Sequence, residues 1–177
     1  MLTVNIPTFN KSHSIKKLLD EHFKIFTMYE VDINIFDNSS NEDTKKIYLK
    51  YKNRLKLNYF KNNDLLSADE NFYQAYFYKK NKDYILLLGD TYKINKKSFE
   101  ALLKILKKKK YDFVILNHAA ISNFGNIEFS DNHELIENLS STITCMSTLI
   151  FHKSIFIKDI YKKYINTNFI HVGILFD

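Results

Sequence analysis

Polar residues that could bind a ligand follow three apolar runs of this 177-residue chain, at the point where each run ends. They are Thr8 and Asn10, Asp37 and Asn38, and Asp90. If the runs are parallel strands of one sheet, these side chains meet at its carboxyl edge, where open α/β sheets bind ligands. Amides and carboxylates there suit the imide and hydroxyls of a nucleoside, and a carboxylate beside a diphosphate suits a divalent cation. Each residue alone is also an ordinary turn former, so the interpretation depends on the set.

The common phosphate-binding loops are excluded by the glycine positions. The chain has three glycines, Gly89, Gly125 and Gly173, and none follows the first apolar run. The dinucleotide fingerprint and the P-loop both need glycines there, because backbone N–H groups must approach a phosphate closely. No segment resembles the G-x-S-x-G turn of hydrolases either.

The elements that would position these residues are short apolar strands alternating with amphipathic helices. Strands are expected at residues 2–6, 31–36, 55–60, 84–88 and 111–116, and helices at 12–26, 40–52, 68–80 and 98–106. Pro7 cannot donate to a sheet ladder, so the first strand should stop there. This alternation predicts an α/β fold with a mainly parallel central sheet and helices on both faces.

Four helix starts are predicted from capping residues. Ser12 and Ser98 are candidate N-caps, Ser40 forms a candidate pair with Asp43, and residues 67–70 read as a capping box. Beyond residue 117 the pattern is looser. We expect a short strand at 127–129, a longer one at 142–151 and a basic amphipathic helix at 153–164.

Composition narrows the class of protein. The net charge of +6 rests on lysine, with Arg54 as the one arginine, which argues against sequence-specific nucleic-acid binding because base readers use arginine. The single cysteine, Cys145, excludes an internal disulfide and a cysteine zinc cluster. No apolar run approaches the roughly 20 residues of a membrane span, and the start of the chain lacks signal-peptide features. We expect a cytoplasmic protein, with the basic segment 153–164 as a candidate for peripheral contact with the inner membrane face.

Four segments, in their order and spacing, resemble the motifs of family 2 glycosyltransferases with the GT-A fold. They are residues 6–10, 35–40, 62–71 and 86–90, and the resemblance covers the first two thirds of the chain. It implies that Pro7, Thr8 and Asn10, with Asp37 and Asn38, hold the nucleotide base, and that Asn71 lies by the nucleoside. It also implies that Asp90 and Thr91 contact the ribose, and that Asp90 binds Mg²⁺ or Mn²⁺ on the diphosphate.

The chain departs from the family at that metal site. Members commonly carry two acids there, whereas Thr91 and Tyr92 follow Asp90 here. Two schemes remain open: Asp90 holds the ion together with diphosphate oxygens, or lysines such as Lys93, Lys96 or Lys97 neutralise the leaving group.

The reaction that the resemblance implies is an inverting transfer from a nucleotide-diphosphate sugar, with a UDP-sugar favoured, to a saccharide or lipid-linked saccharide acceptor. The pathway implied is bacterial surface polysaccharide or lipooligosaccharide synthesis. The acceptor hydroxyl needs a general base, for which His171 and Asp177 are the candidates.

We expect one GT-A domain over residues 1–177. Residues 1–117 form its nucleotide-sugar-binding half, and residues 118–177 form an acceptor-side half that is truncated at its C-terminus. The alternative is a non-catalytic or truncated nucleotide-sugar-binding module that needs a partner. A nucleotidyltransferase fits less well, because residues 7–10 are neither glycine-rich nor basic.

Overall fold

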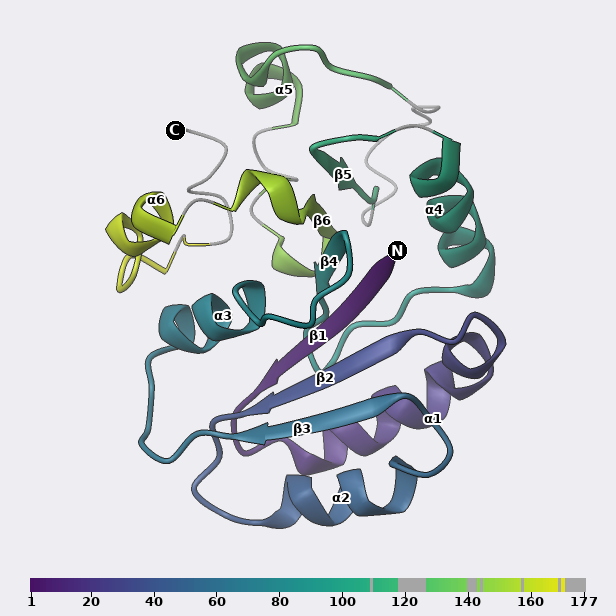
Figure 1. The fold of residues 1–177 in the computed structure, drawn as a ribbon, viewed down its shortest axis with the longest axis vertical. Helices are drawn as coiled ribbons and strands as arrows, with labels where there is room; N and C mark the ends of the chain where they lie inside the picture. The colour runs from purple at the N-terminus through teal and green to yellow at the C-terminus, as the bar shows by residue number, and fades with distance from the viewer. Residues whose placement is uncertain are drawn as a thin grey trace.

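The computed structural model describes residues 1–108, 110–117, 127–139, 143, 145–156, 158–168 and 170. Its centre is a sheet of six strands in the order β3-β2-β1-β4-β6-β5 (Figure 1). Strands β3, β2, β1 and β4 are parallel, and β6 runs antiparallel to both β4 and β5. The strands are β1 Leu2–Thr8, β2 Asp32–Asp37, β3 Leu57–Lys61, β4 Tyr84–Leu87, β5 Phe113–Ile115 and β6 Leu149–His152. The predicted α/β class and mainly parallel sheet are confirmed.

Helices cover both faces of this sheet, so the fold has three layers (Figure 1). They are α1 Ser12–Met28, α2 Asp43–Tyr51, α3 Ala68–Tyr76, α4 Lys96–Lys108, α5 Asn132–Leu139 and α6 Lys158–Lys163. One apolar cluster joins the sheet to α1, α2 and α4, and a second joins its other face to α3, α5 and α6. None of the described helices is long and apolar enough to cross a membrane.

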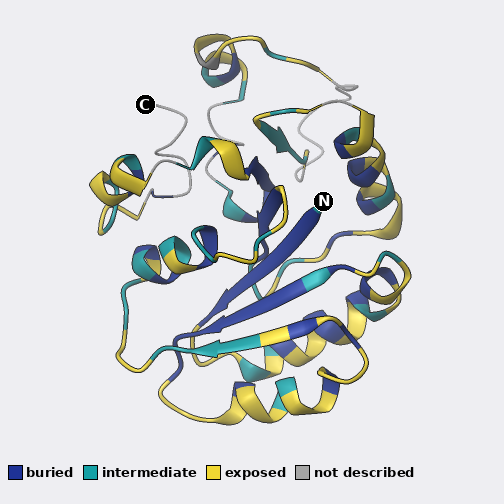
Figure 2. Cartoon of the chain, in the orientation of Figure 1, coloured by how far each residue is buried: buried dark blue, intermediate teal, exposed yellow. Residues whose placement is uncertain are grey.

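Strand β4 shows how the sequence produces these layers. Ile85 and Leu87 pack in the cluster with α3, whereas Leu86 and Leu88 pack in the cluster with α1 and α4. All four side chains are completely buried, and strand β4 has the colour of buried residues in Figure 2. A strand covered on both faces must be apolar at every position, which is why residues 84–88 form an unbroken apolar run.

Strand β1 continues to Thr8, so the prediction that Pro7 ends it is wrong. The register with β2 continues through Pro7 and Thr8, whereas the pairing with β4 stops at Asn5 and Leu87. The Thr8 carbonyl accepts from Asn38 on the β2 side, and the Asn5 carbonyl accepts from Leu88 on the β4 side. The backbone N–H and C=O groups of successive residues point alternately toward the two neighbouring strands. Those of residue 7 therefore point toward β4, beyond the last residue pair that β1 and β4 form. The missing N–H of proline therefore removes no ladder hydrogen bond.

The capping box at α3 is confirmed. Helix α1 begins at Ser12 as expected, but the three predicted serines other than Ser67 do not act as N-caps. Ser67 Oγ accepts from the Glu70 N–H, and the Glu70 carboxylate accepts from the Ser67 N–H. Helices α1 and α2 begin after Lys11 and Glu42 with no side-chain cap, so Ser12 and the Ser40 pair do not act as predicted. At α4, Asn95 Oδ1 accepts from the Ser98 N–H, so the capping side chain lies three positions before the predicted one.

Helix α3 ends at Tyr76 rather than at residue 80. The Asn81 side chain donates to the carbonyl oxygens of Ala75 and Tyr76, both at 2.9 Å. These bonds satisfy carbonyl groups of the last helical turn, which have no partner within the helix; the Ala75 carbonyl also accepts from Asn5 Nδ2 of β1. The side chain of Asn81, which follows the helix, therefore fixes a boundary that helical periodicity alone extends too far.

The described part of the C-terminal third differs most from expectation. Residues 127–129 form no strand, and the strand expected at 142–151 is limited to β6 after the short 3-10 turn Met146–Thr148. The basic helix expected at 153–164 is instead the 3-10 turn Lys153–Ile155 followed by the shorter α6. Tyr161 of α6 is fully buried in an aromatic cluster with Tyr76 and Phe156, and that packing sets the position of α6.

Candidate functional site

A cavity of about 470 Å³ opens at the carboxyl edge of the parallel strands. Its lining comes from the end of β1 and the loop after it, from the residue after β2, from α3 and the loop before it, and from the loop after β4. The lining residues are Pro7, Thr8, Phe9, Lys11, Asn38, Leu65, Leu66, Ala68, Asn71, Phe72 and Asp90. Of the predicted site residues, Pro7, Thr8, Asn38, Asn71 and Asp90 therefore meet in one place.

Thr8 and Asp90 are joined directly at one side of this cavity. Thr8 Oγ1 donates to Asp90 Oδ2 at 3.0 Å. Burial raises the pKa of the Asp90 carboxyl above its usual value, against the opposing effects of the Thr8 hydrogen bond and the charge of Lys11. A half-buried carboxylate next to a hydroxyl can accept from the hydroxyls of a sugar.

Three asparagines fasten α3 to the end of β2. Asn62 Nδ2 donates to Asn38 Oδ1 at 3.1 Å and to Asn71 Oδ1 at 3.2 Å. Asn71 Nδ2 in turn donates to the Phe36 carbonyl, and the Asn38 side chain exchanges two hydrogen bonds with the backbone of Leu66. These bonds hold the wall of the cavity that α3 provides. Asn62 begins the motif segment 62–71 but is not one of the predicted site residues, because a turn asparagine gives no sign of a partner on another element.

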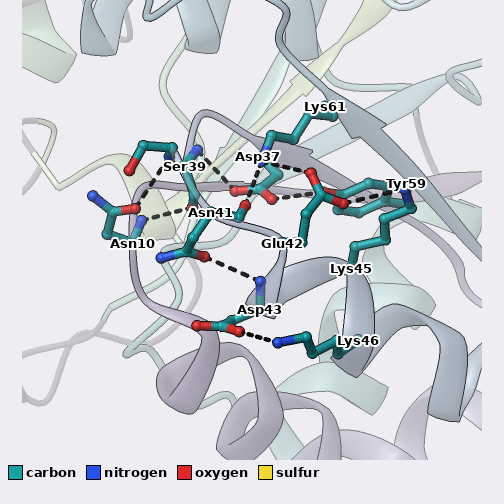
Figure 3. Close-up of polar contacts among 11 residues, drawn as sticks. Asn10, Asp37, Ser39, Asn41, Glu42, Asp43, Lys45, Lys46, Tyr59 and Lys61 are labelled. Atoms are coloured by element: carbon teal, nitrogen blue, oxygen red, sulfur yellow. Dashed lines mark hydrogen bonds and ion pairs between the residues drawn. The ribbon is translucent and has the colours of Figure 1, made fainter.

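Asp37 is fully buried and does not line the cavity. Its Oδ1 accepts from the Ser39 N–H at 2.9 Å, and its Oδ2 accepts from the Tyr59 hydroxyl at 2.7 Å (Figure 3). Burial, followed by this hydrogen bond, raises the pKa of Tyr59 far above its usual value. Asp37 therefore fixes the start of the loop after β2, which contains Asn38.

Asn10 also lies outside the cavity and connects two loops. It adopts the left-handed conformation, with φ of 53°, which asparagine tolerates better than most residues. Its N–H donates to Ser39 Oγ, and its Oδ1 accepts from the Ser40 N–H (Figure 3). The loops after β1 and β2 are thus held together, which aligns the cavity wall that contains Thr8 and Phe9.

Several other predicted residues do not line the cavity. Thr91 is exposed, and Lys93 and Lys96 pair with Glu21 and Glu100, each at 3.7 Å. Lys97 is exposed on α4 and is not part of the lining either. The lysine in the cavity wall is Lys11, which the sequence analysis did not select. The candidate bases His171 and Asp177 lie outside the described residues.

A divalent cation would find few ligands in the described part of the site. The described residues contain no group of three or more His, Cys, Asp or Glu side chains that could hold a metal ion. Asp90 supplies the one carboxylate among the described residues of the cavity lining, and one of its oxygens accepts from Thr8. Because hard cations prefer several oxygen ligands, this donor set fits a resident cation poorly.

The family model described as glycosyl transferase family 2 matches residues 3–173. The chain belongs to this family. The resemblance seen in the motifs is thereby confirmed. A direct comparison with curated protein sequences found no match.

Solved structures show the fold of this family 2 chain. S. aureus TarS 1-349 aligns with a TM-score of 0.73 at 19% identity, covering 98% of this chain and 55% of that one. TarS 1-349 in complex with UDP-GlcNAc gives 0.63 at 19% identity, with coverages of 87% and 46%. The mannosyltransferase PcManGT from Pyrobaculum calidifontis, in complex with GDP-Man and Mn²⁺, gives 0.59 at 12% identity, with coverages of 87% and 45%. The chain therefore spans about half the length of these neighbours.

Proposed function

We propose that this family 2 domain binds a nucleotide-diphosphate sugar, with a UDP-sugar favoured, and transfers the sugar with inversion to a hydroxyl of a saccharide acceptor. The observation that carries the proposal is the cavity at the sheet edge, where Thr8, Asn38, Asn71 and Asp90 meet. Its volume, about 470 Å³, lies within the range of small-ligand sites. TarS, whose structure aligns with this chain, was solved in complex with UDP-GlcNAc, which supports the choice of uridine.

The mouth of the cavity suits a flat nucleotide base. Phe9 is 49% exposed and Leu65 is 72% exposed, although both are large apolar residues. Both line the cavity, as does Phe72 of α3. Covering this apolar surface with a planar ring removes it from water, which makes the free energy of binding more favourable. We assign the base to this part of the cavity, and the ribose to the neighbourhood of Thr8 and Asp90.

We also propose that Asp37 recognises the base, from its buried position at the end of β2. It uses one lone pair on each oxygen for Ser39 and Tyr59. An ionised carboxylate has about four acceptor sites. It can therefore accept the imide N–H of uracil without losing either bond, once the base displaces the side chains that cover it.

Transfer requires a base near the acceptor hydroxyl and positive charge near the departing diphosphate. We keep His171 and Asp177 as the candidates for the base. As the setting, we propose bacterial surface polysaccharide or lipooligosaccharide synthesis in the cytoplasm, at the inner membrane face. Support for membrane contact comes from the exposed lysines of α6, which include Lys158 and Lys162, because basic residues are attracted to anionic head groups.

Calorimetric titration of the chain with UDP, GDP, CDP and CMP tests the proposal. We expect UDP to bind, and we expect Leu65→Ala to weaken its binding several-fold because apolar contact with the base is lost. Leu49→Ala is the matched control, since Leu49 is also an exposed leucine but lies on α2 outside the cavity lining. Binding of none of the four nucleotides would overturn the proposal.

A non-catalytic donor-binding module is the second candidate. The observation that favours it is the single carboxylate in the part of the cavity lining that the structure describes, where the family commonly carries two acids. Incubation with UDP-GlcNAc and a saccharide acceptor separates the two candidates. Release of UDP supports the transferase, and tight binding without release, with and without Mn²⁺, supports the module.

A further inference from the structure

We propose that Lys11 supplies the positive charge that holds the donor's diphosphate in this cavity, so that nucleotide binding does not require a divalent cation. This inference rests on the proposed function, because it concerns the same cavity. It assigns a role to a residue that the motifs do not mark.

The position of Lys11 in the cavity wall supports this role. Lys11 lines the same cavity as Thr8 and Asp90, and it is exposed. It makes no ion pair with any residue that the structure describes, whereas Lys16, Lys93 and Lys96 are each paired with an acid. The charge of Lys11 also acts on Asp90, where it opposes the burial that raises the pKa of that carboxyl. An ammonium group that faces a cavity without a protein partner is available to an anionic ligand.

The charges of the cavity lining also favour this role of Lys11. Among the described residues of its lining, Lys11 and Asp90 are the two that are ionisable, and the others are neutral. Thr91 and Tyr92 bring no second carboxylate. A pair of acids would repel a diphosphate strongly and would need a cation to offset that repulsion. With one carboxylate, whose ionised form burial disfavours, the lining repels a diphosphate less than a pair of acids would, and Lys11 offsets the negative charge that remains.

The chemistry of lysine fits such a role. Its ammonium group is a compact charge with three donors on a flexible stem, so it can follow phosphate oxygens without a fixed geometry. During transfer the negative charge on the departing diphosphate increases, and a cation held against it stabilises that state more than the ground state. No proton or electron has to move to or from Lys11 for this effect.

The test compares UDP with uridine, which shares the nucleoside but lacks the diphosphate, by calorimetry in the presence of EDTA. We expect wild type to prefer UDP, and we expect Lys11→Gln to reduce this preference by about fivefold or more while leaving uridine binding unchanged. Lys11→Arg keeps the charge and should retain most of the preference. Lys17→Gln is the matched control, because Lys17 is an exposed lysine on α1 that does not line the cavity.

The outcomes separate this inference from the proposed function. If wild type binds UDP only after Mn²⁺ is added, or if Lys17→Gln weakens UDP binding as much as Lys11→Gln does, the role of Lys11 is overturned and the donor site stands. If neither UDP nor uridine binds under any condition, both proposals fall. Thermal unfolding of each variant confirms that the domain is intact, which is expected for exposed positions.

Discussion

The side chains of Thr8 and Asp90 meet through a hydrogen bond of 3.0 Å, although 82 positions separate them in the chain. Thr8 is the last residue of β1, and Asp90 follows β4, the neighbouring strand. The parallel pairing of these strands therefore brings two motifs to one side of the cavity. The predictions below test the residues that shape this region.

Asp90→Asn should stabilise the domain at neutral pH. Burial raises the pKa of Asp90 in the folded state above its usual value of 3.8. A carboxyl with a raised folded pKa contributes its full stability below the unfolded pKa, and that contribution is lost as the pH rises through the folded pKa. Asparagine avoids this loss and can still accept from Thr8. Urea unfolding should show the variant to be more stable at pH 7, with a difference that shrinks as the pH falls toward 3.8. A difference that is the same at both pH values would contradict this reading.

Asp37→Ala should weaken UDP binding by about tenfold or more, the scale of a lost hydrogen bond to a charged group. It should also destabilise the domain, because the Ser39 N–H and the Tyr59 hydroxyl lose their acceptor. Tyr59→Phe separates the two effects, since it removes one of these bonds and keeps the carboxylate. We expect calorimetry to give near-wild-type UDP affinity for Tyr59→Phe. A folded Asp37→Ala variant with unchanged affinity would remove Asp37 from base recognition.

Ser67→Ala should lower the free energy of unfolding by about 1 kcal/mol, because it removes the hydrogen bond from the Glu70 N–H to Ser67 Oγ in the α3 capping box. Ser12→Ala is the comparison, since Ser12 lies inside α1 and Lys11 takes the N-cap position without a side-chain hydrogen bond. That variant should change the free energy of unfolding little. Chemical denaturation of both variants gives the measurement, and equal losses would contradict the assigned helix starts.

Gly89→Ala should destabilise the loop that presents Asp90. An added Cβ would lie 3.0 Å from Ser147 Oγ, which also accepts a hydrogen bond from the Gly89 N–H. Overpacking of this kind costs about 1–3 kcal/mol. Ser147→Ala removes the obstructing oxygen, so the same substitution should cost less in that background. A double-mutant cycle of unfolding free energies measures the coupling, and strictly additive losses would rule out the contact.

The elements of the first half of the chain could be predicted from sequence because their signals are local. The apolar run at residues 84–88 and the capping box at Ser67 each depend on neighbouring residues, and both appear as expected. The order of the motifs also predicted the family and the sheet edge at which Thr8, Asn38, Asn71 and Asp90 meet.

Tertiary structure alone decided which side chains face the cavity and how the sheet is completed. Asp37 points inward to Tyr59, Lys11 rather than Lys93 lines the cavity, and β6 enters the sheet antiparallel between β4 and β5. Each of these facts depends on contacts between segments far apart in the chain. Periodicity and capping report only on nearby residues, so they set the elements and their order, whereas packing between elements set the direction of the side chains.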